Sequence, residues 1–330
     1  MLTTIKMEHK INQKEEIFDY VNDVYRNGYN KGLSTGIPWL NKHYTFRKGE
    51  LDVITGFANI GKTTAVFYLM MLASVKYKWK WLCYCPENEP VGDMVIDLAE
   101  MFIGLTADKT KSERMDKSVF DAACRWVMKH FKVVSFPNTP TIYDVMDVFQ
   151  YELDNGDFDG CYVDPMNDLA IDRSMSKYDY YYQVLSDIRR FKQKNFIKFI
   201  LVTHAITKAA RDKDGEGNIP APSHYDVEMG GMFANRTDNF LVIHRNPNSE
   251  DWADTQIHVR KIKFQKLVGI PTQENEPVIL KFEPRICRFK SLNKEKMVWE
   301  DVLQQNTMDF IDAHRVSVKP EIFDSNNLPF

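Results

Sequence analysis

The segment from Gly56 to Thr63 has the residue types and the spacing of a phosphate-binding loop. It reads GFANIGKT, which fits the pattern GxxxxGK[ST], and it lies between a predicted strand and a predicted helix. Its glycines allow the backbone to wrap around a phosphate, and the amides of the loop and of the helix N-terminus point at anionic oxygens. We expect Lys62 to reach the β- and γ-phosphates and the Thr63 hydroxyl to ligate Mg²⁺. The sequence therefore predicts a nucleoside triphosphate site formed by Gly56, Asn59, Gly61, Lys62, Thr63 and Thr64.

Acidic residues follow two further predicted strands. Asp164 ends the apolar run GCYV, at the edge where α/β sheets bind ligands, and we expect it to hold a water of the Mg²⁺ ion. A strand-end turn before Pro165 is the alternative for Asp164. Glu87 and Glu89 follow a strand in CYCPENEP, and either carboxylate is able to polarise an attacking water. Capping of the helix that begins near Pro90 is their alternative role; we favour Glu87 as the base because it lies closer to the strand.

Other nucleotide-binding classes fit the sequence less well. The stretch NKHY at Asn41 lacks the aspartate of a GTPase specificity element and precedes the phosphate loop. No arginine-rich lid of the kind found in small-molecule kinases is evident. A motor ATPase remains, with ATP and Mg²⁺ as its cofactors.

The elements that must position these residues alternate between strand and helix. Parallel neighbours need crossover connections, so this alternation predicts a parallel sheet flanked by helices. The expected strands are residues 50–57, 79–88, 132–136, 158–166 and 197–205. The expected helices are residues 62–78, 90–105, 117–131, 141–156 and 180–196. After about residue 230 the pattern changes to strands joined by hairpins, at residues 239–247, 255–265 and 276–284.

Three parts of the chain are expected. Residues 1–32 form a helical arm and linker, because Ile17, Tyr20, Val21 and Val24 recur at helical spacing before Gly28. This arm packs either on its own domain or on a neighbouring subunit, and the pattern does not choose between the two. Residues 33–290 form the ATPase domain, and residues 291–330 form a C-terminal extension that carries little signal and reads as a tail.

Composition restricts the partners. The 43 basic and 46 acidic residues leave a formal net charge of -3, so any nucleic-acid contact has to come from local loops. The five cysteines form no CxxC pair or zinc-type cluster, which suits a reducing compartment. No apolar run approaches the roughly 20 residues of a membrane span. We expect a cytoplasmic protein with no membrane partner.

The ordered set of motifs resembles one family. The stretch STGIPWLNKHYTFRKGELDVITGFANIGKTT resembles the start of the RecA-like ATPase domain of replicative ring helicases of the DnaB and Twinkle type. Later stretches are similar to that family in the same order, over residues 33–285: CPENEP, YVDPMNDL, ILVTHAITK, EMGGMFANRTDNFLVIHRNP and VRKIKFQKLVG. The resemblance implies an α/β fold of the RecA-like P-loop NTPase type, with a mostly parallel central sheet and antiparallel strands added at the C-terminal side.

The resemblance also implies roles for individual residues. Glu87 activates water, Asp164 supports Mg²⁺, and His204 senses the γ-phosphate and couples it to the DNA loop. The alternative for His204 is a histidine packed at a strand end. The family usually places an arginine in trans, two residues after a lysine, and here Lys261 and Lys263 hold those positions.

The missing arginine has several possible consequences. A lysine is a point charge and cannot make the planar two-pronged contact of a guanidinium. Either Lys263 substitutes, or Arg260 or Arg245 reaches the neighbouring nucleotide, or hydrolysis is slow. An exposed face of a basic strand is the alternative for these residues.

Two polar loops follow the carboxyl ends of the predicted strands and are candidates for contact with single-stranded DNA. Basic residues interleaved with aromatics bind a single strand through phosphates and stacking. The first loop, before a run of tyrosines at 180–182 that could equally be buried in a helix, has Arg173 and Lys177. The second loop, which we favour, has Lys208, Arg211 and Lys213.

These observations predict one RecA-like ATPase domain that works as a ring on single-stranded DNA. The expected assembly is a homo-oligomer, a hexamer, that hydrolyses ATP between subunits and has a primase or a helicase loader as a further partner. Its compactness would suit a phage or plasmid replication system. One alternative is a RecA- or KaiC-like ATPase that binds DNA without unwinding it. Another is a regulatory or scaffold protein that binds ATP, which the missing arginine favours.

Overall fold

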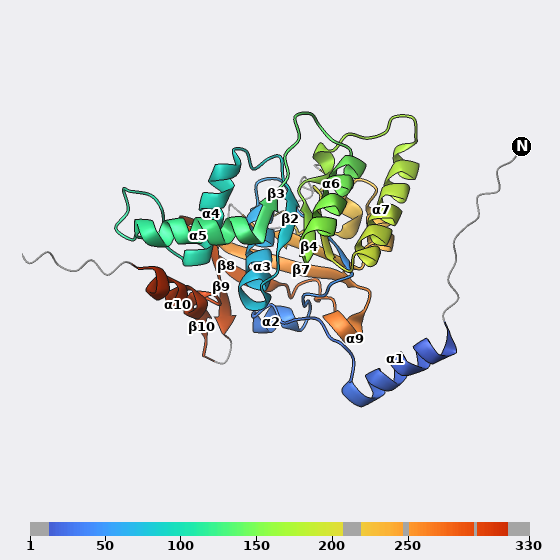
Figure 1. Ribbon diagram of the computed structural model, residues 1–330, viewed down its shortest axis with the longest axis horizontal. Coiled ribbons are helices and arrows are strands. Elements are labelled where there is room, and N and C mark those ends of the chain that lie inside the picture. Colours follow the sequence, from blue (N-terminus) through green and yellow to red (C-terminus); the bar gives the residue numbers. More distant parts are fainter. Residues whose placement is uncertain (1–12, 207–218, 247–250, 294–295, 316–330) are drawn as a thin grey trace, which may run out of the picture.

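A ten-stranded sheet crosses the protein in the order β10-β9-β8-β7-β6-β1-β5-β4-β2-β3. The computed structural model describes residues 13–206, 219–246, 251–293 and 296–315 (Figure 1). The strands are β1 (Leu51–Thr55), β2 (Trp81–Tyr84), β3 (Phe131–Val133), β4 (Gly160–Val163), β5 (Lys198–Val202), β6 (Asn239–His244), β7 (Asp254–Ile262), β8 (Val278–Glu283), β9 (Arg288–Asn293) and β10 (Val298–Glu300).

The helices lie mostly between the parallel strands. The α-helices are α1 (Lys14–Asn27), α2 (Pro38–Asn41), α3 (Lys62–Tyr77), α4 (Val91–Ile103), α5 (Lys117–His130), α6 (Ile142–Asn155), α7 (Lys177–Lys194), α8 (Gly230–Arg236), α9 (Gln265–Val268) and α10 (Gln304–His314). Short 3-10 helices are η1 (Met166–Asp168), η3 (His224–Asp226) and η4 (Pro284–Ile286). Among the described residues, no helix combines the length and the apolar character needed to cross a membrane.

The parallel part of the sheet carries the predicted alternation. β1 pairs in parallel with β5 on one side and with β6 on the other, and β5, β4, β2 and β3 continue in parallel. Every residue of β1 is buried, as expected for a strand covered by helices on both faces. β7 to β10 extend the sheet antiparallel beyond β6. The expected α/β fold, with antiparallel strands added at the C-terminal side, is confirmed.

The helices cover the two faces of the sheet as separate layers. In Figure 1, α4 and α5 lie on one side of β2, β3 and β4, and α6 and α7 lie on the other. Successive strand residues point to opposite faces. Ile54 therefore packs in the apolar cluster of α3, α4 and α5, whereas Leu51 and Val53 pack in the cluster of α6 and α7. The loops at the carboxyl ends of the strands are left between the layers, where they can form a site.

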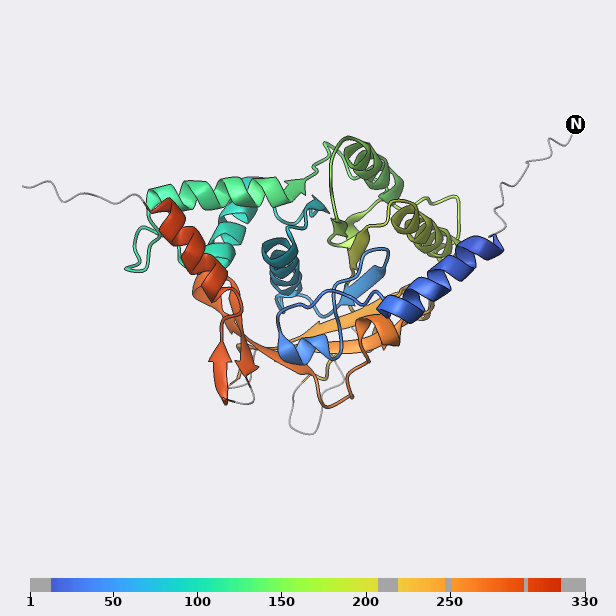
Figure 2. The same cartoon turned by 60° about the horizontal axis from the view of Figure 1, so that its bottom comes forward.

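The helix α1 does not pack on the domain. It has no buried residue, and Tyr20 and Tyr25 are 66% and 90% exposed. Figures 1 and 2 both show it extending away from the sheet. Of the two expected positions for this arm, packing on its own domain is therefore wrong for the residues that the structure describes.

Residues 291–315 differ from the expected tail. They complete β9 and form β10 and α10, and α10 packs against α4 and α5. The buried guanidinium of Arg288 donates to Asp301 Oδ2 and to Thr307 Oγ1, each at 2.6 Å. Phe310 also packs on Phe102, with 4.8 Å between ring centroids. The expected boundary at residue 290 thus falls inside β9, because charged residues that look exposed in the sequence form a buried cluster.

Candidate functional site

The loop between β1 and α3 has the backbone that phosphate binding requires. Asn59 and Gly61 have positive φ angles of 59° and 80°, and α3 begins directly afterwards at Lys62. A Cβ at Gly56 would lie 2.3 Å from the carbonyl oxygen of Ile243, so only glycine fits there. The helix N-terminus and its free amides therefore face the space inside the loop, as an anion site needs.

Lys62 is buried inside this loop and has replaceable partners. Its Nζ donates to the Phe57 carbonyl oxygen at 2.7 Å and lies 3.1 Å from His204 Nδ1. Burial lowers the pKa of Lys62, although the charges of Asp164 and Glu87 oppose the shift. Neither contact at hydrogen-bond distance is with a carboxylate, so an entering phosphate would meet an ammonium that no anion neutralises directly.

Thr63 and Asp164 meet across the sheet edge. The Thr63 hydroxyl donates to Asp164 Oδ2 at 2.7 Å, and the buried Tyr162 hydroxyl donates to the same oxygen. Burial raises the pKa of Asp164, while these two hydrogen bonds and the charge of Lys62 oppose the rise. No cluster of three or more His, Cys, Asp or Glu residues suited to a metal occurs in the described part of the chain. One hydroxyl and one carboxylate fit Mg²⁺, which takes its other ligands from water and phosphates.

Glu87 and His204 face each other beside Lys62. The distance from His204 Nε2 to Glu87 Oε1 is 4.0 Å, and the Glu87 side chain is about half exposed. Burial raises the pKa of Glu87, and the charges of Asp168 and Asp164 add to the rise. Glu89 instead accepts a hydrogen bond from the Ser135 hydroxyl at 3.1 Å. Of the two glutamates, the structure brings only Glu87 to the lysine and the histidine.

His204 is held as a neutral imidazole. Burial lowers its pKa, and the charge of Lys62 lowers it further. A neutral ring leaves Nδ1 free to accept from the Lys62 ammonium. The backbone N–H of His204 donates to Asn167 Oδ1 at 3.1 Å. Sequence reasoning missed Asn167, because an asparagine in the turn after Asp164 has no local signal beyond the turn itself.

Lys261 and Lys263 lie at the opposite edge of the sheet. β7 runs antiparallel to β6 and ends where Ile262 pairs with Asn239, at the amino end of β6. Lys261 Nζ donates to the carbonyl oxygens of Ala234 and Thr237, at 2.6 and 2.7 Å. Lys263 Nζ lies 3.3 Å from Asp238 Oδ1. Neither lysine is near the phosphate loop of its own chain.

Arg245 borders its own phosphate loop. A Cβ at Gly61 would lie 3.3 Å from the Arg245 guanidinium, which donates to Thr255 Oγ1 and lies 4.5 Å from the Phe282 ring centroid. This position makes Arg245 a wall of the site in its own chain, so the expectation that it reaches a neighbouring nucleotide is not supported. Arg260 lines a separate cavity of about 390 Å³ with His244 and His258.

The candidate DNA-binding residues are only partly described. Arg173 is exposed in the loop between η1 and α7, whereas Lys177 Nζ pairs with Glu228 Oε1 at 2.7 Å. Lys208, Arg211 and Lys213 lie outside the described residues. Tyr180 and Tyr181 are buried in the first turns of α7, so the alternative of a helix that buries its rings is correct for them.

Comparison with solved structures defines the class of fold. One solved structure, an isolated ATPase domain, matches with a TM-score of 0.69 at 14% identity, over 86% of this chain and 100% of that one. A structure of a DnaB-like replicative helicase, described together with its interactions with primase, matches with a TM-score of 0.64 at 14% identity, over 86% of this chain and 67% of that one. The fold is therefore the RecA-like fold of DnaB-like ATPase domains.

Sequence comparison points to a particular relative. The chain is 28% identical over 267 residues to the Twinkle homolog protein, chloroplastic/mitochondrial, of Arabidopsis thaliana. The match covers 77% of this chain and 36% of the relative, so the chain spans well under half of that protein's length. No family model matches the chain. The resemblance to the DnaB and Twinkle type, first indicated by the motifs, is confirmed.

Proposed function

We propose that this chain is a replicative DNA helicase, a ring ATPase that moves along single-stranded DNA by hydrolysing ATP. The observation that carries the proposal is the set of contacts at the carboxyl ends of β1, β4 and β5. There Lys62 contacts His204, and Thr63 contacts Asp164. A phosphate cradle, a metal-binding pair and a phosphate sensor are what ATP hydrolysis requires.

Each residue has a distinct task in this proposal. Lys62 exchanges the Phe57 carbonyl and the His204 ring for phosphate oxygens. Thr63 and Asp164 hold Mg²⁺, which neutralises the charge that develops on the phosphates when it is bound. Glu87 orients and polarises the attacking water; its raised pKa brings its basicity nearer to the working pH. His204 reports the state of the phosphates through the contact that it shares with Lys62.

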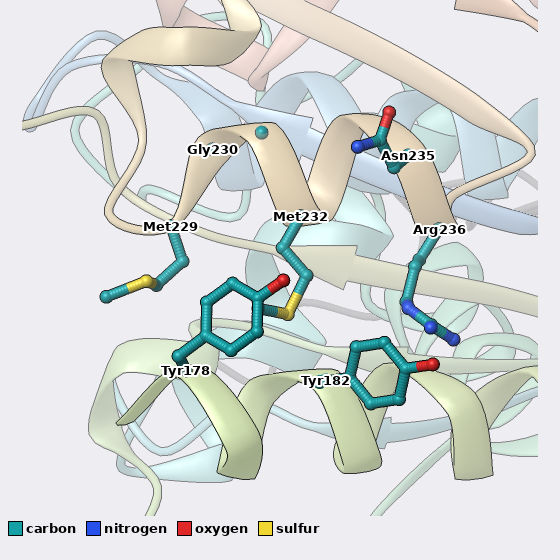
Figure 3. Close-up of a pocket in the computed structure, with 8 residues that line it drawn as sticks. Tyr178, Tyr182, Met229, Gly230, Met232, Asn235 and Arg236 are labelled. Atoms are coloured by element: carbon teal, nitrogen blue, oxygen red, sulfur yellow. The ribbon is translucent and has the colours of Figure 1, made fainter. Parts of the chain in front are cut away.

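Assembly as a homo-oligomeric ring is supported by the exposed apolar face of α1. We assign as its seat the groove between α7 and α8 on a neighbouring copy, a cavity of about 400 Å³. Figure 3 shows Tyr178 and Tyr182 from α7 facing Met229 and Met232 from the other wall. Arg236 lies over the Tyr182 ring at 3.5 Å and complements the acidic first turn of α1. Replacement of Tyr20 by aspartate is expected to yield monomers in light scattering, and an unchanged oligomer would remove α1 from the interface.

The trans contact is proposed for Lys263. In a ring, the edge opposite the phosphate loop of one subunit is available to face the loop of the next. Lys263 is 40% exposed at that edge, and the buried Asp238 holds its ammonium. A lysine supplies charge without the guanidinium fork, so slower hydrolysis than with arginine is expected.

Single-stranded DNA is the proposed substrate track, and primase or a helicase loader is the proposed partner. Arg173 and Lys177 stand on the loop after β4, and Lys208, Arg211 and Lys213 belong to the segment after β5. Both segments leave the sheet at the edge that carries Lys62. DNA and ATP would therefore act on neighbouring parts of the same strands.

Strand displacement tests the proposal. The protein is incubated with a forked duplex that carries a fluorescent strand, with ATP and Mg²⁺, and release of that strand is followed. We expect ATP-dependent release by the unmodified chain and none by the Lys62→Ala variant. ATP hydrolysis without strand release would favour the RecA- or KaiC-like alternative, in which DNA is bound but not unwound.

A regulatory or scaffold protein that binds ATP is the second candidate function. The lysine at position 263 in place of arginine favours it, because this substitution weakens the trans contact. Tight ATP binding with negligible turnover, both with and without DNA, would support this candidate over the helicase.

A further inference from the structure

One side chain joins the candidate DNA loop to the phosphate sensor. Asn167 lies in η1, three residues after Asp164 and before the loop that carries Arg173. Its Oδ1 accepts two hydrogen bonds from the end of β5, one from the Thr203 hydroxyl and one from the His204 backbone N–H, both at 3.1 Å. Asn167 is thus the described contact between this loop and the backbone of His204.

The need for this contact follows from the way in which the strands end. β5 pairs with β4 as far as Leu201 opposite Val163, after which the β4 chain turns away. On the other side, the Thr203 N–H still donates to the Ile54 carbonyl oxygen at 3.0 Å. The next N–H, that of His204, points to the side where β4 has ended. Because a backbone N–H needs a partner, the Asn167 amide takes the place of the missing strand.

The loop that carries Asn167 is held at both ends. Asp164 begins it at the metal-binding pair, and the Ala170 N–H donates to the Pro140 carbonyl oxygen at 2.9 Å. Arg173 then lies in the exposed stretch before α7. A hydrogen bond of 3.1 Å that lengthens by about 0.5 Å is no longer a hydrogen bond. A small displacement of this loop would therefore release His204 from its anchor.

We propose that Asn167 is a positioning residue that couples occupancy of the loop at 169–176 by single-stranded DNA to the contact between His204 and Lys62. This inference rests on the proposed function. Asn167 does not touch the nucleotide in this account. It fixes the backbone of the residue whose ring contacts the phosphate-binding lysine.

The test compares two replacements of similar size. Asn167→Leu removes the accepting oxygen, whereas Asn167→Asp keeps it. ATP hydrolysis is measured for each variant and for the unmodified chain, with and without a single-stranded oligonucleotide. We expect stimulation of about tenfold in the unmodified chain and in Asn167→Asp, and a ratio near one in Asn167→Leu. The loss in Asn167→Leu is expected in kcat with DNA present, while the KM for ATP changes by less than about threefold.

Each outcome has a defined meaning. Stimulation of Asn167→Leu to the level of the unmodified chain would overturn the inference and leave the proposed function intact. Equal loss in Asn167→Asp would also overturn it, because the accepting oxygen would not be the cause. An unmodified chain that is indifferent to DNA would refute the proposed function together with the inference. Thermal melting checks that each variant is folded, and Asn167→Ala serves as a second variant without the oxygen if leucine prevents folding.

Discussion

The two edges of the parallel sheet both contain buried lysines, and the difference between them separates a structural charge from a functional one. At the amino edge, Lys198 is 0% exposed and lies 2.6 Å from Asp52 Oδ1. Asn239 and Tyr44 also donate to Asp52, so that its carboxylate is fully used. At the carboxyl edge, Lys62 contacts a loop carbonyl and a neutral imidazole instead.

This contrast indicates which lysine is reserved for a ligand. A buried ion pair compensates for the loss of water only when its hydrogen bonds are complete, and the cluster around Lys198 meets that condition. Lys62 is buried without such a partner, and burial lowers its pKa. The fold therefore tolerates an uncompensated cation at the phosphate loop. We infer that the compensation comes from phosphate.

The largest predicted effect is on activity at the carboxyl edge. Lys62→Ala is expected to reduce ATP hydrolysis by on the order of a thousandfold, because the side chain stabilises charge on the phosphates. The free energy of unfolding should change by less than about 1 kcal/mol, since the replacement also removes a buried charge. Steady-state hydrolysis and urea denaturation measure the two quantities. Hydrolysis at the unmodified rate would contradict the assignment of the site.

The converse effect is predicted at the amino edge. Lys198→Met leaves Asp52 and Glu50 buried without their cation and is expected to lower the free energy of unfolding by about 3–5 kcal/mol. Lys48→Met is the matched control, because Lys48 pairs with Asp159 at a partly exposed site and should cost less than about 1 kcal/mol. Urea denaturation compares the two. Equal losses would remove the distinction between the edges.

Acid is predicted to act on the buried histidines beside the carboxyl edge. Burial lowers the pKa of His258 to about 3, and the charges of Arg260 and His244 add to the shift. The unfolded chain has a histidine pKa near 6.5, so it binds the proton more readily than the folded chain does. Stability is therefore complete above about pH 6.5 and falls as the pH drops toward 3.

The size of this acid effect can be measured with a matched pair of variants. Between about pH 6.5 and about pH 5 the contribution of His258 is about 2 kcal/mol, so His258→Gln should lose less stability than the unmodified chain over that range. His314→Gln, at an exposed position, should follow the unmodified chain. Parallel pH curves for all three proteins would show that His258 is not the sensitive group.

The smallest predicted effect concerns the surface loop. Lys177 and Glu228 are both largely exposed, so Lys177→Ala should change the free energy of unfolding by less than about 0.5 kcal/mol. If Lys177 contacts DNA, the slope of log affinity for single strands against log salt should fall by about 0.7. Binding titrations at several salt concentrations measure this slope. An unchanged slope would exclude Lys177 from the DNA contact.

The parts of the site that depend on local pattern could be predicted from the sequence. The phosphate loop and the aspartate at the end of β4 are each set by a few neighbouring residues, and the structure brings Thr63 and Asp164 together. Asn167 and Arg245 were not found as parts of the site in their own chain. Their positions depend on where β4 stops pairing with β5 and on the closeness of β6 to the loop, which no short stretch encodes.

The same reason explains the differences in the fold. The alternation of strands and helices predicted the parallel part, because each element has its own periodicity. The third strand is shorter and earlier than expected, at Phe131–Val133. The C-terminal cluster of Arg288, Asp301 and Thr307 joins residues with polar side chains that lack any apolar periodicity. Only the packing of α10 on α4 and α5 makes them part of the interior.

The most direct test of the central claim is the rate of ATP hydrolysis by the purified chain with and without single-stranded DNA. The account predicts Mg²⁺-dependent hydrolysis that rises by about tenfold when the strand is added, because the DNA loops and the phosphate sensor share the ends of β4 and β5. A rate that is absent, or that does not respond to the strand, would contradict a DNA-driven motor and favour a protein that only binds ATP.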